Sequence, residues 1–276
     1  MSSGQKESGD FKIRQKVGKY KIERRLGSGG FAAVYQALDT VQGIRVAIKI
    51  PHARHTTEAV LSEFRKEIRA TSKLEHENIL PIKDASIIDD RLVVVFPLGE
   101  QTLLQRMGRR LSTETAFEIV EQILMATAEA HKFHVIHCDI KPENIIMFPG
   151  NRVRLADFGI AKVSQKTVQG GGTGTVGYMA PEQAMGKPSF RSDVFSIGLI
   201  VWRLLAGEWP AWPFEWPAKG YSKLRGRIHQ DFIDFMRKAI DVNPRHRFRD
   251  AQQMRDAFLK LKYRTLRHAK AHRKAA

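Results

Sequence analysis

The chain has 276 residues and 42% of them are hydrophobic, so it is long enough to bury one large core or two small ones. No apolar run reaches the roughly 18 residues needed to cross a bilayer, the start of the chain lacks the apolar stretch of a secretory signal, and a lone Cys138 excludes an internal disulfide. We therefore expect a soluble, unexported protein of the reducing cytoplasm, with no disulfide partner.

The formal net charge of +17 is concentrated at the two ends of the chain, in residues 1–25 and 257–276. Basic ends are usually solvated tails, and in some proteins they contact anionic membranes or nucleic acid. The aromatic residues that single-strand binding grooves place among basic ones are sparse in both segments. The two alternatives at this point are a plain solvated tail and a weak contact with an anionic membrane or nucleic acid.

The first half of the chain is predicted to be rich in strands. Residues 1–18 are rich in Ser, Gly, Lys and Gln without an apolar period, which indicates a flexible basic lead-in. Apolar and β-branched runs then predict strands, and one run with helical spacing predicts a helix. The strands are expected at Tyr20–Leu26, Ala33–Leu38, Arg45–Ile50, Ile79–Ile88 and Leu92–Phe96, and the helix at Thr57–Leu74.

After Leu98 the pattern becomes mainly helical. Helices are expected at Thr115–His131, with a capping box from Thr115 to Glu118, and at Ser192–Ala206, Gln230–Ile240 and Ala251–Tyr263. Two short apolar runs around Gly150 and Asn151, namely Ile145–Phe148 and Val153–Ala156, predict a hairpin. The layout is a β-rich lobe followed by a helical one, with a cleft between them. The basic residues 263–276 are expected to form a tail.

The segment His137–Asn144, with the sequence HCDIKPEN, has the side chains that phosphoryl transfer uses. Asp139 can accept the proton of a hydroxyl nucleophile, Lys141 can neutralise charge on the transferred group, and the amide oxygen of Asn144 can bind magnesium. A polar turn before an apolar strand would contain similar residues. The other motifs of the chain decide between these two interpretations.

A glycine-rich loop lies between the first two predicted strands. Gly27, Ser28, Gly29, Gly30 and Phe31 form a stretch in which glycines permit close backbone approach to phosphates. A strand on each side argues against the Rossmann and Walker settings, which need a helix to follow. On its own such a loop is also compatible with a simple turn.

A lysine follows in an apolar strand, in the sequence Val46-Ala47-Ile48-Lys49. Burying a lysine is costly unless an anion pairs with it. We expect a phosphate or a carboxylate as its partner, and Glu67 on the following helix is the natural candidate.

Further motifs complete a pattern that resembles the eukaryotic-type, or Hanks-type, protein kinases over about residues 19–262. These motifs are Asp157-Phe158-Gly159, Ala180-Pro181-Glu182, the run from Ser192 to Gly198, and Arg247. Together with the glycine loop, Lys49 and the segment His137–Asn144, which we call the catalytic loop, they occur in the order found in that family. The resemblance implies an α+β, bilobal protein-kinase fold. Its β-rich N-lobe with one main helix would span about 19–97, and its mainly helical C-lobe about 98–262.

The resemblance also implies a role for each matching residue. Lys49 would hold the α- and β-phosphates of ATP and pair with Glu67, under the backbone of Gly27–Phe31. Asp157 and Asn144 would coordinate magnesium, Asp139 would act as base or positioner of the hydroxyl, and Lys141 would contact the γ-phosphate. Leu26, Val34 and Ala47 would complete the nucleotide site. Glu182 would pair with Arg247 in a structural role.

The adenine-binding hinge should lie in Val94–Gly99, where Phe96-Pro97 departs from the common pattern and leaves the gatekeeper open between Val95 and Phe96. The residues Lys141 and Thr175 resemble those at the matching positions of serine/threonine kinases rather than those of tyrosine kinases. The glycine loop and the sequence Tyr178–Gln183 resemble those of bacterial members of the family. The resemblance therefore implies an ATP- and magnesium-dependent kinase acting on protein serine or threonine hydroxyls.

Two departures from the family pattern affect regulation more than chemistry. Ala32 replaces the third loop glycine, a small change that should not block ATP. Cys138 replaces the arginine that usually precedes the catalytic aspartate and that helps hold a phosphorylated activation loop. Lys162 remains as a partner for a phosphate near the flexible segment Ser164–Thr175, but one lysine would hold the phosphate less firmly. We expect activation to depend little on phosphorylation of that segment.

Alternatives remain open at several places. Cys138 reads either as a small buried residue or as a redox switch. The tryptophans 209, 212 and 216 alternate with prolines and read as a packed loop or as a docking patch. For the whole chain, the rivals to a protein kinase are a non-catalytic kinase-fold scaffold that binds nucleic acid or membrane, and a small-molecule kinase.

Overall fold

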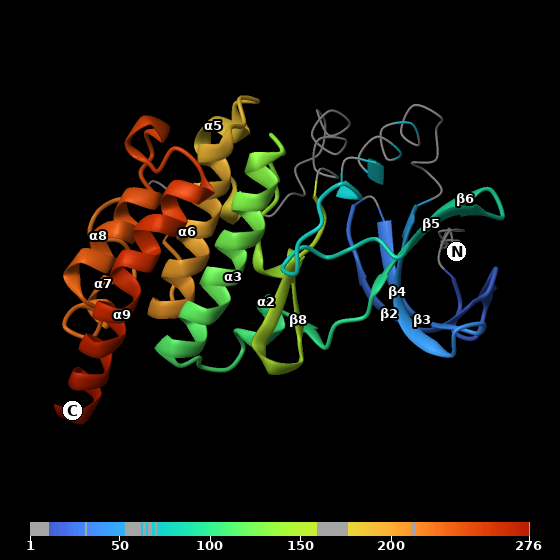
Figure 1. The fold of residues 1–276 in the computed structure, drawn as a ribbon, viewed down its shortest axis with the longest axis horizontal. Coiled ribbons are helices and arrows are strands. Elements are labelled where there is room, and N and C mark those ends of the chain that lie inside the picture. Colours follow the sequence, from blue (N-terminus) through green and yellow to red (C-terminus); the bar gives the residue numbers. More distant parts are fainter. Residues whose placement is uncertain are drawn as a thin grey trace, which may run out of the picture. The chain divides into compact units, whose positions relative to one another are not determined.

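The computed structural model describes residues 11–30, 32–52, 62, 65, 68, 69, 71–158, 176–210 and 214–275. These residues form two compact units (Figure 1). The first contains the described residues up to Glu75 together with Leu80–Gly99, and the second contains His76–Ile79 and the described residues from Glu100 onward. The first is built mainly of strands and the second mainly of helices, as the sequence predicted.

The first unit is an antiparallel sheet of six strands in the order β1-β2-β3-β4-β6-β5. Strand β1 spans Lys16–Val17, β2 Tyr20–Ser28, β3 Ala32–Asp39, β4 Ile44–Pro51, β5 Asp84–Ile88 and β6 Arg91–Pro97. One face of β3, β4 and β6 is apolar and forms the core of the unit. Successive side chains of a strand point to opposite faces, so the residues between these core positions lie on the other face.

The residues predicted to surround the nucleotide lie on that second face. Lys49 is the register partner of Val34 on β3, and Ala47 lies two residues away on the same face of β4. The core face of β4 instead carries Val46 and Ile48, which are 1% and 0% exposed. The alternation of the VAIK sequence therefore separates its packing residues from its ligand-binding candidates.

Three expectations for this unit need correction or fall outside the described residues. Residues 11–17 belong to the folded unit rather than to a flexible lead-in, since Phe11 packs edge-on against Tyr35 and Val17 is buried. The strand predicted from Ile79 begins only at Asp84, because Pro81 lacks the N–H that a ladder needs. Of the predicted helix 57–74, the described residues 62, 65, 68, 69 and 71 are helical, and the rest lies outside the described residues except 72–74.

The second unit packs its helices around the buried helix α6 (Figure 1). Its helices are α2 Leu103–Arg106, α3 Thr113–Lys132, α5 Pro181–Ala184, α6 Phe190–Ala206, α7 Tyr221–Leu224, α8 Gln230–Ala239 and α9 Ala251–Ala275. Phe117, Phe232 and Phe258 form an aromatic cluster between α3, α8 and α9. Gly198 lets α6 approach α8, since a side chain there would lie 2.8 Å from that of Ala239.

The described part of this unit also contains a small sheet and several short 3-10 helices. Strands β7 Gln101–Thr102, β8 Ile145–Phe148 and β9 Arg152–Leu155 pair in that order, and the predicted hairpin around Gly150 is confirmed. The 3-10 helices are η2 Pro142–Asn144, η3 Pro149–Asn151, η4 Val176–Tyr178 and η5 Pro244–His246. None of the helices in the described part of the chain is both long and apolar enough to span a bilayer.

Two helix ends differ from the sequence expectation. Helix α3 begins at Thr113, and its cap is Ser112, whose side chain accepts a hydrogen bond from the backbone of Thr115 at 3.0 Å. The predicted capping box at Thr115 was therefore wrong by three residues. Helix α9 does not stop at Tyr263 but continues to Ala275, so residues 263–275 form helix rather than a free tail.

Candidate active site

The catalytic loop is tied to the core of the helical unit by Asp193 of α6, whose carboxylate is 1% exposed. One carboxylate oxygen accepts hydrogen bonds from the backbone N–H of His137 at 2.8 Å and from the His131 ring at 2.9 Å. The other accepts from the backbone N–H of Cys138 at 2.9 Å. A buried carboxylate bonded in this way fixes the loop just before Asp139.

The backbone turns sharply at Cys138, which has a φ of 64° and is buried. A non-glycine residue in this left-handed region costs energy and persists only where neighbours hold it. Besides Asp193, the side chain of Gln183 holds it by donating to the Cys138 carbonyl. The buried position supports the reading of Cys138 as a small packed residue.

His137 has a structural role. Its Nδ1 accepts the backbone N–H of Asp139 at 3.2 Å, so its Nε2 must carry the proton that it donates to the Ala156 carbonyl at 2.9 Å. The ring also packs against Phe158, with centroids 4.6 Å apart. His137 therefore joins the catalytic loop to the residues on either side of Asp157.

The three polar side chains of the catalytic loop meet at one point. The Asp139 carboxylate lies 2.8 Å from the Lys141 ammonium and accepts a hydrogen bond of 2.9 Å from the Asn144 amide nitrogen. That amide nitrogen also donates to the Asp139 backbone carbonyl at 2.9 Å. With its nitrogen used twice by Asp139, Asn144 keeps its amide oxygen for another partner. The loop is thus arranged for chemistry at a half-exposed carboxylate.

Asp157 lies beside this group because its strand is bonded to the loop. The backbone N–H of Ala156 donates to the carbonyl of Asn144 at 2.8 Å. Asp157 then adopts a φ of 63°, a second left-handed residue within the site. Left-handed non-glycine residues concentrate at functional sites. The next residue, Phe158, is 3% exposed and anchors the turn in the core.

The residues of this group fit a magnesium ion with phosphate ligands. Magnesium prefers hard oxygen ligands, and it usually takes one or two from the protein and the rest from phosphates and water. Asp157 offers a carboxylate, and the orientation of Asn144 leaves an amide oxygen. Among the described residues no cluster of three His, Cys, Asp or Glu side chains forms a self-sufficient metal cage. A shared metal–nucleotide site suits this donor set.

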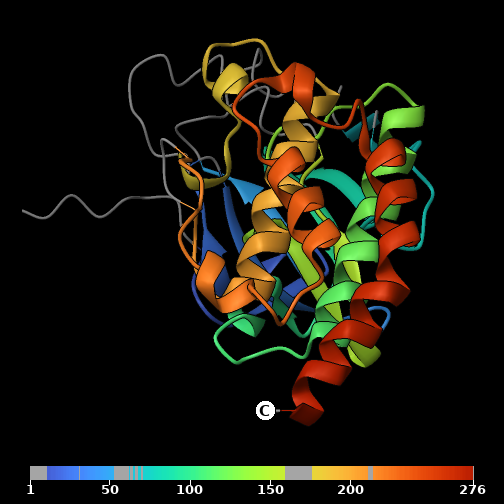
Figure 2. The ribbon, with the colours of Figure 1, turned by 90° about the vertical axis from the view of Figure 1, so that its left-hand side faces the viewer.

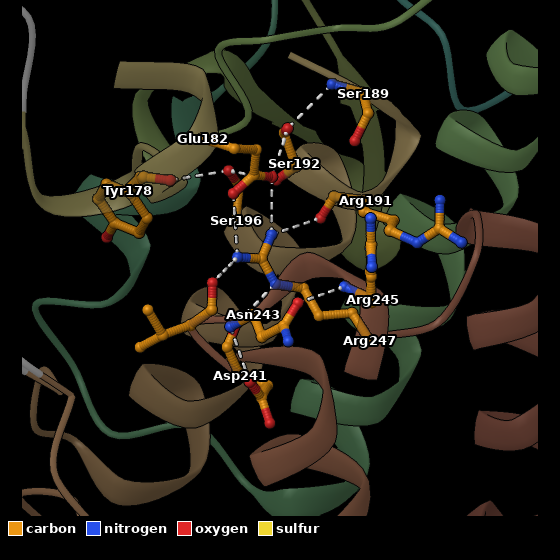
Figure 3. A network of polar contacts seen from close by, with 11 residues as sticks. Tyr178, Glu182, Ser189, Arg191, Ser192, Ser196, Asp241, Asn243, Arg245 and Arg247 are labelled. Carbon is orange, nitrogen blue, oxygen red and sulfur yellow. Dashed lines mark hydrogen bonds and ion pairs between the residues drawn. The ribbon is translucent and has the colours of Figure 1, made fainter. Parts of the chain in front are cut away.

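The predicted pair of Glu182 and Arg247 is present and buried (Figure 3). Two bonds of 2.8 and 3.1 Å join the guanidinium to both carboxylate oxygens. Arg247 also donates to the backbone carbonyls of Arg191, Asp241 and Val242, and its side chain is 0% exposed. Burial lowers the pKa of Arg247, and the bonds to Glu182 oppose that shift. This pair is structural, as predicted.

Serines of α6 connect the same network to the segment before it (Figure 3). Ser192 donates to Glu182 at 2.7 Å, and Ser196 donates to the Tyr178 carbonyl at 2.7 Å. The Tyr178 hydroxyl accepts from Arg203 at 2.7 Å, and Trp209 packs edge-on against the Tyr178 ring. Trp209 therefore packs against its own unit and does not form part of a docking patch. Trp212 lies outside the described residues.

Sequence reasoning missed Asp193 and Gln183 as supports of the catalytic loop. The available signal was a carboxylate inside the otherwise apolar helix Ser192–Ala206, since a buried charge needs partners. A further missed residue is Glu143 in the catalytic loop. Its Oε2 is buried without a hydrogen-bond partner among the described residues.

The nucleotide-binding candidates of the first unit lie along β2, the loop after it, and β4. Gly27 pairs with Val34 between β2 and β3, and a side chain added at Gly27 or Gly30 would meet no atom within 4 Å. Leu26 is 39% exposed at the same end of β2. Phe31 and Glu67 lie outside the described residues, so the pairing of Glu67 with Lys49 stays a prediction. Ser28 and Gly29 are exposed residues of the loop, and their phosphate contacts also stay predictions.

Register places the two gatekeeper candidates on different faces of the sheet. Phe96 lies opposite Ala47, and Val95 lies opposite Ile48. Val95 therefore belongs to the core of the unit, where it is 2% exposed. Phe96 shares its face with Lys49.

Comparison with known proteins identifies the family. The protein kinase domain model matches residues 20–259. The chain is 31% identical over 255 residues to serine/threonine-protein kinase PrkC of Bacillus subtilis, covering 86% of this chain and 39% of PrkC. It is 35% identical over 207 residues to serine/threonine-protein kinase PknA of Mycobacterium tuberculosis, covering 70% of this chain and 48% of PknA.

Solved structures show the same fold. The kinase domain of Mycobacterium tuberculosis PknI superposes with a TM-score of 0.69 at 22% identity, covering 91% of this chain and 99% of that domain. The chain spans 39% to 48% of the length of the two curated relatives above, so it corresponds to part of them. The expected bilobal α+β fold is thus confirmed. The chain belongs to the protein kinase family.

Proposed function

We propose that this chain is an active kinase that transfers the γ-phosphate of ATP to serine or threonine hydroxyls of protein substrates. The observation that carries the proposal is the complete catalytic group of the helical unit. Lys141 and Asn144 each lie within hydrogen-bond distance of the Asp139 carboxylate, and the backbone N–H of Ala156, just before Asp157, donates to the Asn144 carbonyl. Pseudokinases usually lack one of these residues or Lys49.

The geometry assigns a task to each side chain. Asp139 accepts or orients the proton of the acceptor hydroxyl, because its carboxylate is the half-exposed group of the loop. Lys141, 2.8 Å from that carboxylate, places a positive charge where the transferred phosphoryl group gains negative charge. Asn144 and Asp157 would hold magnesium, which neutralises phosphate charge when bound. Lys49 would bind the remaining phosphates from the first unit.

Catalysis of this type depends on positioning more than on covalent chemistry. That requirement explains why so many buried contacts converge on the loop. Asp193 fixes the backbone before Asp139, and His137 fixes the approach to Asp157. A scaffold that only binds partners would gain nothing from two left-handed residues, at Cys138 and Asp157, in one site.

A transfer assay separates the proposal from its rivals. The chain is incubated with magnesium and γ-labelled ATP and offered itself, a basic serine/threonine protein or a small hydroxyl compound as acceptor. We expect label on serine or threonine of the protein acceptors and a large loss in Asp139→Asn. Transfer to small compounds alone would indicate a small-molecule kinase. No transfer to any acceptor would support the scaffold.

We further propose that activation depends little on phosphorylation of the activation segment. Cys138 supports this, because the buried thiol at that position has no guanidinium with which to hold a phosphate. The segment Ser164–Thr175 itself lies outside the described residues. The variant Ser164→Ala/Thr167→Ala/Thr173→Ala should keep most of its activity towards an added substrate, and a collapse of that activity would contradict the proposal. Thr175 stays intact because its expected docking role would confound the result.

The place of action and the anionic partners are also proposals. The single buried cysteine supports the proposal that the protein acts in the reducing cytoplasm. The basic residues near the two ends of the chain support a weak contact with an anionic membrane or nucleic acid. Fractionation of cells with an antibody against the protein would contradict the first proposal if the protein were found outside the cytoplasmic and peripheral membrane fractions.

A further inference from the structure

The last turns of α9 are docked on the helical unit. Thr265 and Ala269 are 1% and 4% exposed and continue the buried side of the helix beyond Tyr263. His268 contacts the Gly226 carbonyl through Nε2 at 2.7 Å, and Arg273 lies 3.3 Å from the Glu114 carboxylate of α3. The helix therefore holds its outward side chains in fixed directions. A free basic tail would not hold its side chains in fixed directions.

The outward side of these turns is strongly basic. Arg267, Lys270 and Lys274 are exposed, at a spacing of three and four residues that places them on one side of a helix. None of the three makes an ion pair with the residues that the structure describes. Tyr263, 71% exposed, lies one turn before Arg267.

Two other segments bring further arginines to the same end of the unit. Arg109 and Arg110 are exposed just before α3, and Arg225 is exposed just after α7. The segment 225–229 touches α9 through Gly226, and Arg110 is close enough to Arg227 that its charge adds to burial in lowering the Arg227 pKa. Like charges so near each other are unfavourable unless an anion lies across them.

Among the described residues, the two carboxylates that form ion pairs with α9 beyond Tyr263 form them with other basic residues. Glu114 is engaged by Arg273, and Asp231 by Arg264 at 2.6 Å. Both therefore serve to attach α9 rather than to offset Arg267, Lys270 or Lys274. The positive charge left over is available to an external partner.

The arrangement suits a flat anionic surface. In two views at right angles, the end of α9 extends past the other helices of its unit (Figure 1 and Figure 2). Single-strand nucleic-acid sites combine a groove with aromatic residues that stack on bases. Tyr263 is the one exposed Phe, Tyr or Trp that the structure describes in residues 263–274. Binding to anionic membrane headgroups requires only that several basic side chains reach one plane.

We propose that this C-terminal basic surface, formed by Arg109, Arg110, Arg225, Arg267, Lys270 and Lys274, binds the headgroups of an anionic membrane. It deepens the proposed contact with an anionic partner by naming its location and class. The binding would place the kinase at the cytoplasmic face of a bilayer, and for that purpose it rests on the proposed kinase function. The binding itself does not require phosphoryl transfer.

The test measures binding of the full chain to vesicles of phosphatidylcholine with or without phosphatidylserine. We expect binding only to the vesicles that contain phosphatidylserine, with a decrease as salt rises. The variant Arg267→Ala/Lys270→Ala/Lys274→Ala should weaken that binding roughly 100-fold. The control Lys73→Ala/Lys83→Ala/Lys187→Ala removes the same charge from exposed residues away from both ends of the chain and should bind like the unchanged chain.

Three outcomes would overturn the proposal. The α9 variant could bind as tightly as the unchanged chain, or the control could lose as much binding as the α9 variant, which would indicate net charge alone. Duplex DNA or RNA could bind where the vesicles do not, with loss in the α9 variant, which would assign the surface to nucleic acid. Thermal unfolding verifies that each variant is folded.

Kinase activity separates this proposal from the proposed function. The α9 variant should phosphorylate a soluble peptide at the unchanged rate, and Asp139→Asn should still bind phosphatidylserine vesicles. An inactive chain that binds vesicles would contradict the kinase function alone. An active chain that binds no vesicles would contradict the membrane surface alone.

Discussion

The two units hold their candidate site residues in different ways. In the helical unit, Asp139 and Asn144 are hydrogen-bonded to each other, and the loop before them is held by the buried Asp193. In the sheet unit, a side chain added at Gly27 or Gly30 would meet no atom within 4 Å, and Lys49 lies on the sheet face opposite the core. The side chains to which we assign the reaction are therefore fixed by buried contacts. The loop to which we assign the phosphates has space beside its glycines.

This contrast predicts where substitutions act. Changes in the helical half should damage the reaction or the fold, because its polar groups are buried and mutually satisfied. Changes in the sheet half should act through nucleotide affinity and leave stability unchanged. The variants below test this division, beginning with the largest expected effect.

Among the four positions compared in turn, replacement of Asp157 should give the largest effect. Asp157→Asn removes the one carboxylate that we assign to magnesium and should lower kcat by about 10²–10³-fold. The loss should be accompanied by weaker magnesium-dependent ATP binding in calorimetry, with little change in thermal unfolding. Excess chelator should reproduce the loss in the unchanged chain. If Asp157→Asn kept full activity at limiting magnesium, the assignment would be wrong.

Replacement of Asp193 tests the brace itself. Asp193→Ala leaves two backbone N–H groups and His131 without their buried partner, and should lower the free energy of unfolding by about 3 kcal/mol or more. Denaturant unfolding measures this value. Asp234→Ala, an exposed acid of α8, serves as control and should change stability by less than about 0.5 kcal/mol. Equal effects of the two variants would show that Asp193 braces nothing.

Gly27 tests the open half. Gly27→Ala meets no atom within 4 Å, so the melting temperature should stay the same, while the added methyl should obstruct phosphates and raise KM for ATP several-fold. Gly150→Ala should lower the stability and leave the KM for ATP unchanged. Gly150 has a φ of 75°, so alanine there should lower the free energy of unfolding by about 1 kcal/mol. A fall in stability with Gly27→Ala would contradict the contrast.

The smallest effect is expected at Glu114, which attaches the end of α9. Hydrogen bonds from its own backbone N–H, from Ser112 and from Arg273 lower its pKa below the usual 4.5, while burial opposes that shift. A carboxyl whose pKa is lower in the folded state stabilises the protein above its unfolded pKa, and this contribution is lost as the pH falls through the folded value. Glu114→Gln should therefore cost about 0.5 kcal/mol near pH 7 and progressively less as the pH falls well below 4.5, as measured by thermal unfolding near pH 7 and near pH 3. An equal cost at both pH values would exclude this explanation.

The sequence predicts the site better than it predicts the supports of the site. Asp139, Lys141 and Asn144 lie in one short segment, so the fold need only present them, and the pair of Glu182 with Arg247 follows from the family pattern. Asp193 could not be assigned to the loop, because its partners are distant in sequence and no local pattern reports them. The hairpin at Gly150 was visible because its signal is local.

Helix α9 shows a different limit. Beyond Tyr263 its buried side consists of small residues such as Thr265 and Ala269, so the apolar period fades although the helix continues. Ion pairs to Glu114 and Asp231 from other elements help to hold it there. The charge of this segment was plain from composition. Its fixed arrangement depends on tertiary contacts that the sequence pattern does not reveal.

The most direct test of the account is a paired measurement on Asp139→Asn. Calorimetry gives its affinity for ATP with magnesium, and a labelled-phosphate assay gives its rate of transfer to a serine/threonine peptide. The account predicts an affinity near that of the unchanged chain and a transfer rate lower by about 10²–10⁴-fold. A variant that binds ATP and still transfers phosphate at the unchanged rate would contradict the central role of the braced catalytic loop.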